Sequence, residues 1–379
     1  MSGVVRWKIY LDWLISRYVR KNVKNDIKYL LRVSLYQLCF MKKAGHHVVN
    51  ETVEFAKRVH GPRVAHFVNA VLRNFLREWD SLSHRPLPEG TPTQLLSLSH
   101  SFPEWLIKRW LRRFGNEDTQ RLLTTLNSSP EFGIRVNLNR ISREEVVNRL
   151  REEGVGVRKG IFLESAIYVD KLAQVLKNDL FKEKVIHVQD EASQLAGFSI
   201  KPEEHAVVLD ACAGLGTKTR QLTEQRAGAV IIAMDKEIKR LKLAPDAAAL
   251  IKGDAINSPF RDASFDAILL DAPCSSLGII RKHPDIKWRR KERDLAPFGN
   301  YQLNLLRSLW RNLKIGGQMI YSVCSFEPEE TTSVIDRFKK DEAFVLENPL
   351  PFLFNKDYFL SLPHETTMDG FFIARLKKL

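Results

Sequence analysis

Two of the four cysteines in this chain stand directly after short apolar runs that read as strands. Cys274 ends the motif Asp271-Ala-Pro-Cys, and Cys324 lies in Tyr321-Ser-Val-Cys-Ser. The carboxyl ends of parallel strands meet at one edge of a sheet, where such sheets hold their ligands. We therefore expect both thiols at one edge. Two cysteines at the same edge predict thiol chemistry, whereas most buried cysteines serve only in packing.

A glycine-rich turn is the second feature with chemical meaning. Asp210-Ala-Cys-Ala-Gly-Leu-Gly-Thr-Lys-Thr219 follows another apolar run and opens a helix, and its glycines let the backbone approach a ligand closely. Asp235 ends the next run, where an acid accepts hydrogen bonds from a ribose diol. Asp254 follows the third run, where it could receive an adenine amino group.

These features predict a cofactor that carries a nucleoside. S-adenosyl-L-methionine fits better than NAD, because the third glycine of the dinucleotide fingerprint is missing, and the ending of a Walker phosphate loop is also absent. We predict no metal site. The predicted cofactor-binding residues are Cys212, Ala213, Gly214, Leu215, Gly216, Thr217, Lys218, Asp235, Asp254 and Asp271.

A basic stretch lies between the two cysteine motifs. Residues 281–293 contain seven Lys and Arg residues, interleaved with His283 and Trp288. Basic side chains with an aromatic ring among them suit phosphates and stacked bases of RNA, whereas the alternative is a solvated charged helix. The predicted RNA-binding residues are Arg281, Lys282, Lys287, Trp288, Arg289 and Arg290.

The elements that must position these residues follow from hydrophobic periodicity. Apolar residues at helical spacing predict helices through the first 80 residues, with Cys39 as a small core residue, and again around Ile107–Phe114. Residues 81–93 contain three prolines and a glycine and read as a linker. The middle of the chain predicts strands at 133–137, 161–163 and 166–169 and a helix at 142–153.

From about residue 186 the pattern alternates between strands and helices. Continuous apolar runs suit strands that are buried on both faces, hence a parallel sheet. The predicted strands are 206–209, 229–234, 250–252, 265–270 and 318–322, with a final pair at 344–347 and 370–376. The predicted helices lie near 217–224, 300–314 and 329–340.

Charge is distributed unevenly along the 379 residues. The formal net charge is +14, and residues 1–115 hold 20 Lys and Arg against 8 Asp and Glu. A basic excess confined to one third of a chain favours a polyanion-binding module, against the simpler reading of a solvated surface. Few cysteines and no apolar run of the ~18 residues that a membrane span needs predict a cytoplasmic protein without a membrane partner.

The order of these motifs resembles the RNA cytosine-5 methyltransferases, and within them the bacterial RsmB (Sun or Fmu) branch that modifies small-subunit ribosomal RNA. The likeness also includes Arg281-Lys-His-Pro-Asp-Ile-Lys-Trp288, Val188-Gln-Asp-Glu-Ala-Ser193 and Asp369-Gly-Phe-Phe372. Residues 27–79 resemble the NusB-like RNA-binding domain of this branch. The glycine-rich turn departs from the family pattern by a shifted glycine, and the stretch between Asp235 and Asp254 is shorter than usual.

The resemblance implies a multi-domain protein. We expect an all-α NusB-like RNA-binding domain at 1–80 that lacks its opening helices, the linker at 81–93 and a helical and α+β RNA-binding module at 94–185. An α/β Rossmann-like S-adenosylmethionine-dependent methyltransferase domain follows at 186–379. The implied partner is small-subunit ribosomal RNA, and we expect a monomer.

The resemblance also implies roles for four side chains. Cys324 would be the nucleophile that adds to carbon 6 of cytosine, and Cys274 would assist breakdown of the covalent adduct. Asp271 would contact ring N3 and the amino edge, and Lys218 would help to hold the target base.

Three other functions remain open at this level. The enzyme could act on transfer RNA instead of ribosomal RNA. The chain could also be a non-enzymatic RNA-binding assembly factor, although its retained acids and cysteines argue against that. The third alternative is an NAD-dependent dehydrogenase, which would need a third glycine that the turn at residues 210–219 lacks.

Overall fold

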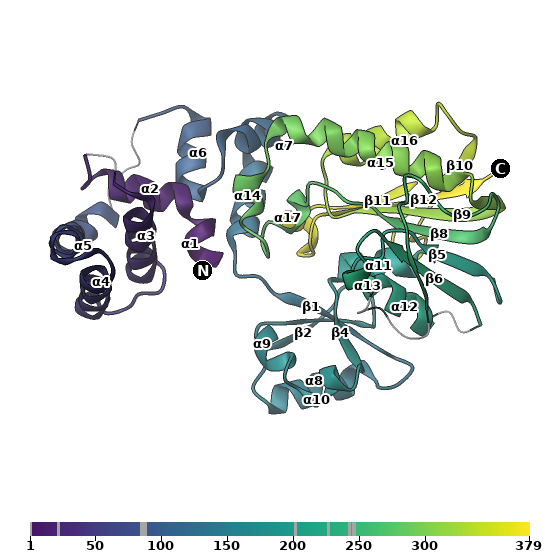
Figure 1. The fold of residues 1–379 in the computed structure, drawn as a ribbon, viewed down its shortest axis with the longest axis horizontal. Helices are drawn as coiled ribbons and strands as arrows, with labels where there is room; N and C mark the ends of the chain where they lie inside the picture. Colours follow the sequence, from purple (N-terminus) through teal and green to yellow (C-terminus); the bar gives the residue numbers. More distant parts are fainter. Residues whose placement is uncertain are drawn as a thin grey trace. The chain divides into compact units, whose positions relative to one another are not determined.

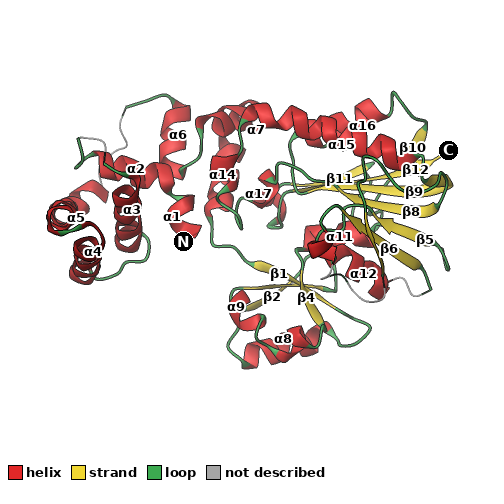
Figure 2. Cartoon of the chain, in the orientation of Figure 1, coloured by secondary structure: helices red, strands yellow, loops and turns green. Residues whose placement is uncertain are grey.

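The computed structural model describes residues 2–20, 23–83, 89–200, 203–225, 228–241, 244 and 248–379. Contacts divide the chain into two compact units (Figures 1 and 2). Unit 1 comprises the chain up to Asn127 together with His283–Arg289, and unit 2 comprises Ser128–Lys282 and Arg290–Leu379. No helix in the described ranges is both long enough and apolar enough to cross a membrane.

The described residues of unit 1 form helices and no strands, as the periodicity of this part predicts. Val68, Leu72 and Phe75 repeat at helical spacing and are fully buried, and the same core includes Leu31 and Leu35. The helices are α1 (Ser2–Arg6), α2 (Lys8–Ser16), α3 (Asn25–Cys39), α4 (Gly45–His60), α5 (Pro62–Ser83), α6 (Pro92–His100), α7 (Glu104–Asn127) and α14 (Ile286–Arg289).

The predicted linker is shorter in the structure. Helix α5 extends to Ser83 and α6 begins at Pro92, while residues 84–88 lie outside the described part of the chain. Thr91 explains the early start of α6, because its side chain accepts a hydrogen bond from Gln94 N and the Gln94 side chain accepts one from Thr91 N. Residues 94–127, which we grouped with the α+β module, belong to unit 1 by their contacts.

The middle of the chain forms a small α+β module within unit 2. Its four strands are antiparallel, in the order β2-β3-β1-β4. The elements are β1 (Phe132–Val136), α8 (Arg143–Glu152), β2 (Val157–Lys159), β3 (Ala166–Val169), α9 (Leu172–Val175), α10 (Asp179–Lys182) and β4 (Ile186–Val188).

The strand predicted at residues 161–163 does not form. The backbone N–H groups of Ile161, Phe162 and Leu163 donate to the buried Glu191 carboxylate, at 3.1, 2.6 and 2.8 Å. A side-chain acceptor therefore replaces the neighbouring strand that the apolar pattern suggested.

The rest of unit 2 is a large twisted sheet between two layers of helices (Figure 1). Its strand order is β10-β12-β9-β8-β5-β6-β7, with β11 paired to β12. Strands β5 to β9 are parallel, as predicted, whereas β10, β11 and β12 pair antiparallel.

The elements of this part follow in chain order. The helices are α11 (Glu191–Phe198), α12 (Thr217–Gln225), α13 (Ile238–Leu241), η1 (Leu277–Ile279), η2 (Glu292–Asp294), α15 (Leu295–Trp310), η3 (Pro328–Glu330), α16 (Thr332–Phe338) and α17 (Pro363–Thr366). The strands are β5 (Val207–Asp210), β6 (Val230–Asp235), β7 (Ala249–Lys252), β8 (Phe265–Asp271), β9 (Leu313–Val323), β10 (Phe344–Glu347), β11 (Tyr358–Ser361) and β12 (Phe371–Lys378).

Strand β8 shows why its apolar run is continuous. Ile268 and Leu270 pack into the core that contains residues of α15 and α16, whereas Ala267 and Leu269 pack into the core that contains residues of α11 and α12. Both faces of the strand are therefore buried, as a central parallel strand requires.

Helix α15 differs from its prediction at both ends. It begins at Leu295, before the predicted residue 300, because Pro297 falls in its first turn, where a missing N–H costs nothing. The predicted helix ran on to residue 314, but Leu313 already pairs with Phe265 as the first residue of β9.

Candidate active site

The sheet brings the two cysteines together. Strands β8 and β9 run parallel with Asp271 opposite Ser322, so the segments that follow them leave the same edge. The Sγ atoms of Cys274 and Cys324 lie 3.0 Å apart, and both cysteines are free. The neighbouring Cys324 side chain, together with burial, raises the pKa of Cys274 well above its usual range. Burial and the neighbouring sulfur therefore favour the protonated form of the Cys274 thiol.

Asp271 and Lys218 form an ion pair at the carboxyl end of β8. Lys218 Nζ donates to Asp271 Oδ2 at 2.5 Å, and Ser322 Oγ donates to Oδ1 at 2.9 Å. Lys218 lies in the first turn of α12 and is mostly buried, whereas the Asp271 side chain is about one-third exposed. The carboxylate is thus held in place while part of it stays accessible.

Asp235 organises the glycine-rich turn. Its Oδ2 accepts a hydrogen bond from Gly214 N and its Oδ1 accepts one from Glu237 N, both at 2.9 Å. Gly214 and Gly216 have positive φ angles of 56° and 74°, which favour glycine. Each Asp235 oxygen keeps a second acceptor position for a ligand hydroxyl.

These residues surround a cavity of about 670 Å³. Asp235, Asp271, Cys274, Cys324 and Tyr301 all line it. A carboxylate with acceptor positions left over, next to an open cavity of this size, fits a ribose-bearing cofactor. The remaining lining residues are Ala211, Cys212, Lys236, Glu237, Arg240, Gly253, Ala255, Ala272, Pro273, Ser276, Arg290 and Phe298.

The other predicted cofactor residues lie in different places, and Ala213, Gly214 and Lys218 line neither this cavity nor its neighbour. Cys212 lines the cavity, while Asp254 lies between two lining residues and forms an ion pair with Lys236 at 3.0 Å. Leu215, Gly216 and Thr217 instead line a neighbouring cavity of about 600 Å³, together with residues of the α+β module. The structure therefore brings only part of the turn to the thiols.

Several of the predicted RNA-binding residues make contacts inside the protein, which leaves them less available to RNA than we expected. Arg281 is 5% exposed and donates to Thr367 O. Lys282 lies between two buried carboxylates, with Nζ at 2.6 Å from Asp190 and 2.7 Å from Asp369. Arg281 and Lys282 therefore make contacts within unit 2 that stabilise its fold.

Lys287 and Trp288 lie within unit 1. Lys287 Nζ is fully buried and donates to Arg6 O, Ser101 O and the Asn127 side chain, at 3.2, 3.2 and 2.7 Å. Trp288 Nε1 donates to Val5 O at 2.8 Å. These two side chains are structural contacts of the helical unit.

The last two residues of the predicted set are more accessible. The Arg289 side chain is 73% exposed and pairs with Asp285. Arg290 lines the thiol cavity, where its Nε donates to Ser275 O at 2.8 Å and its guanidinium lies over the Phe298 ring. Arg289 and Arg290 are therefore the members of the set that remain available to RNA.

Sequence reasoning missed several residues around the thiols. Ser275 and Ser325 directly follow the two cysteines, so the repeated Cys-Ser dipeptide was the available signal. Glu330 accepts hydrogen bonds from both serines, and Gln302 donates one to the Pro273 carbonyl. Nothing in the sequence separates Glu330 from the neighbouring Glu327 and Glu329.

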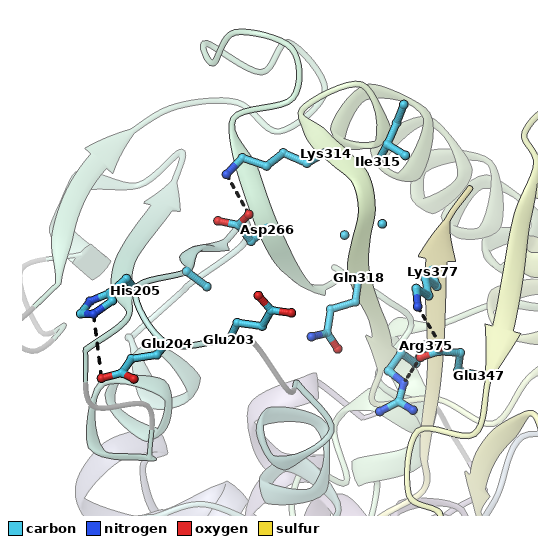
Figure 3. Close-up of a pocket in the computed structure, with 13 residues that line it drawn as sticks. Glu203, Glu204, His205, Asp266, Lys314, Ile315, Gln318, Glu347, Arg375 and Lys377 are labelled. Carbon is cyan, nitrogen blue, oxygen red and sulfur yellow. Dashed lines mark hydrogen bonds and ion pairs between the residues drawn. The ribbon is translucent and has the colours of Figure 1, made fainter.

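A second cavity, of about 680 Å³, lies at the opposite edge of the sheet (Figure 3). It is lined by residues at the amino ends of β8 and β9, including the ion pair between Lys314 and Asp266 at 2.7 Å. None of the predicted catalytic or cofactor residues lines it. The side chains that could take part in catalysis therefore lie at the carboxyl edge of the sheet.

Comparisons with known proteins agree with this architecture. Residues 198–377 match the family model of the 16S rRNA methyltransferase RsmB/F, residues 1–77 match the NusB family, and residues 102–176 match the ferredoxin-like domain of RsmF/B-like methyltransferases. The crystal structure of PH0851 superposes with a TM-score of 0.83 at 25% identity, covering 100% of this chain and 88% of that one.

Curated relatives match over nearly the whole chain. Ribosomal RNA small subunit methyltransferase B of Vibrio cholerae is 34% identical over 392 residues, which cover 99% of this chain and 87% of the relative. The probable ribosomal RNA small subunit methyltransferase B of Bacillus subtilis is 32% identical over 403 residues, covering 99% and 88%.

The sheet and its carboxyl-edge site define an S-adenosylmethionine-dependent methyltransferase, which confirms the predicted cofactor. The all-α, α+β and α/β order of the domains confirms the predicted fold class. The chain belongs to the ribosomal RNA small subunit methyltransferase B family.

Proposed function

We propose that this enzyme transfers a methyl group to carbon 5 of a cytosine in small-subunit ribosomal RNA through a covalent adduct with Cys324. The observation that carries the proposal is the 3.0 Å separation of two free thiols beside Asp271, in one cavity. The names of the full-length relatives support ribosomal RNA as the substrate.

The chemistry explains why a nucleophile is needed. Carbon 5 of cytosine is a poor nucleophile until a thiolate adds to carbon 6, which turns the ring into an enamine. In the proposed first step, the Cys324 sulfur forms a bond to carbon 6 and electron density moves to carbon 5. S-adenosylmethionine, when bound, supplies an electrophilic methyl group to that carbon.

Completion of the reaction requires loss of the carbon-5 proton and of the thiolate. Cys274 first releases its own thiol proton to solvent, and its thiolate then takes the carbon-5 proton. The carbon 5–carbon 6 double bond re-forms, and the carbon–sulfur bond breaks to return the Cys324 thiolate. The Cys324 side chain is the largest cause of the raised Cys274 pKa. Once that sulfur is bonded to carbon 6, this cause weakens and the pKa of Cys274 falls, so Cys274 loses its own proton more readily at the step that needs its thiolate.

Asp271 and Lys218 would hold the target ring. The Asp271 carboxylate accepts hydrogen bonds from Lys218 and Ser322, which fix it beside the thiols. From there it could accept from the cytosine amino group and from a protonated ring N3. Asp235 would bind the cofactor ribose, and Cys212 and Asp254 would flank the same site.

A nucleic-acid measurement tests the reaction and its substrate together. Bisulfite sequencing of small-subunit ribosomal RNA from cells that lack the protein should show one protected cytosine become reactive. Wild-type protein should restore protection, and Cys324→Ser should not. Ribosomal RNA with unchanged protection in the deletion strain would contradict the proposal.

A further inference from the structure

A buried carboxylate connects the two cysteine-bearing loops. Glu330 ends η3 and has no exposed surface. Its Oε1 accepts from Ser275 N at 2.6 Å, and its Oε2 accepts from Ser275 Oγ at 2.5 Å and from Ser325 Oγ at 2.7 Å. Since Ser275 follows Cys274 and Ser325 follows Cys324, one side chain holds both loops.

Glu330 has a full set of donors. Gln302 Nε2 gives the fourth hydrogen bond, to Oε1 at 3.2 Å, and also donates to Pro273 O at 3.0 Å. Four donors fill the acceptor positions of a carboxylate, which offsets the cost of burying it. Burial raises the pKa of Glu330.

The backbone ties the same loops on another side. Gly278 N donates to Cys324 O at 3.1 Å, and Gly370 N donates to Gly278 O at 2.9 Å. A Cβ atom on Gly278 would collide with the Gly370 carbonyl. Two sets of contacts therefore join the cysteine-bearing loops. One is the backbone hydrogen bond from Gly278 to Cys324, and the other is the Glu330 carboxylate, which binds the serine after each cysteine.

We propose that Glu330 is the positioning residue that holds the two thiols at their working separation. Its bond to Ser325 supports adduct formation by Cys324, and its bonds to Ser275 support adduct release by Cys274. Glu330 does not line the thiol cavity, so it acts through the two serines and does not touch substrate. This inference rests on the proposed function.

Two serine variants separate the two effects and are matched to each other. Each hydroxyl donates to Glu330 Oε2 and accepts from a backbone N–H two residues further on, at 3.3 Å in both cases. Ser325→Ala should slow formation of the protein–RNA adduct by about tenfold, the effect of one hydrogen bond to a charged group. Ser275→Ala should instead slow breakdown of the adduct by about tenfold.

The Glu330 variants test the carboxylate itself. Glu330→Ala should slow both steps. Glu330→Gln should restore much of the rate, because its NH2 group can donate to the two serine hydroxyls while its oxygen keeps the other donors. Glu329→Ala, one residue earlier in the same turn, is the control for a general effect on the turn.

The experiment follows adduct formation and decay on denaturing gels after the full-length enzyme is mixed with an unmodified small-subunit ribosomal RNA transcript and S-adenosylmethionine. Slower adduct formation in Ser325→Ala, together with slower adduct breakdown in Ser275→Ala, supports the inference. Equal slowing of both steps by both variants would mean a purely structural role and would overturn it. If neither wild-type enzyme nor Cys274→Ala forms an adduct, the proposed function itself fails, which is a distinguishable result.

Discussion

Asp235 is the residue on which the cofactor assignment depends most. Both of its carboxylate oxygens already hold backbone N–H groups, and both keep acceptor capacity toward the cavity. Asp235→Ala should weaken S-adenosylmethionine binding by roughly ten- to a hundredfold, because hydrogen bonds to a charged group contribute about 1.5–3 kcal/mol.

Isothermal titration calorimetry measures this effect directly. Asp262→Ala removes an equally charged side chain that is 79% exposed and lies outside the cavity, so its affinity should match wild type. An unchanged affinity in Asp235→Ala would remove this residue from the cofactor site.

The positions of residues could be predicted where those residues directly follow a strand. Cys274, Cys324 and Asp235 each follow or end a parallel strand, and the sequence pattern that predicts the strand also predicts the edge at which they lie. Glu330 could not be predicted in this way, because its importance comes from serines that are 55 and 5 residues away in sequence.

At the scale of elements, α14 shows how a motif can be misread. The pattern of basic residues around Trp288 suits RNA, yet Lys287 of this helix has three acceptors inside unit 1. Burial depends on tertiary packing, and a short charged helix carries no periodicity that would reveal it. The long helices and parallel strands were predictable because their apolar faces are wide and regular.

A substitution in α14 distinguishes a structural lysine from an RNA contact. Lys287→Met should destabilise the protein by about 2–4 kcal/mol, because it leaves buried acceptors without a donor. Arg289→Met, in the same helix but exposed, should change stability by less than about 0.5 kcal/mol.

Urea-induced unfolding and RNA binding should be measured on both variants. Weaker RNA binding by Lys287→Met at wild-type stability would restore the RNA-binding interpretation of this lysine.

At the scale of the whole molecule, charge is the feature that relates the helical N-terminal part to RNA. Lys57, Arg58, Arg63, Arg73 and Arg77 are exposed on α4 and α5. Replacing them with glutamine should flatten the salt dependence of RNA binding, by a slope of about 0.7–0.9 for each phosphate that is no longer neutralised. Substitutions test this better than a deletion, because Val5 and Arg6 supply acceptors to Trp288 and Lys287.

The control replaces the exposed Lys339 and Lys340, next to α16, with glutamine. RNA affinity should be measured across a range of salt concentrations for both variants and wild type. The same slope in the α4–α5 variant as in wild type would mean that these residues form only a solvated surface.

The division of labour between the two thiols is the central claim, and trapping of the covalent adduct tests it most directly. Full-length wild-type, Cys324→Ser and Cys274→Ala enzymes would be incubated with S-adenosylmethionine and unmodified small-subunit ribosomal RNA, then run on a denaturing gel. We predict that Cys274→Ala accumulates a denaturation-resistant protein–RNA adduct and that Cys324→Ser forms none and transfers no methyl group. An adduct in Cys324→Ser but not in Cys274→Ala would show that the two roles are reversed.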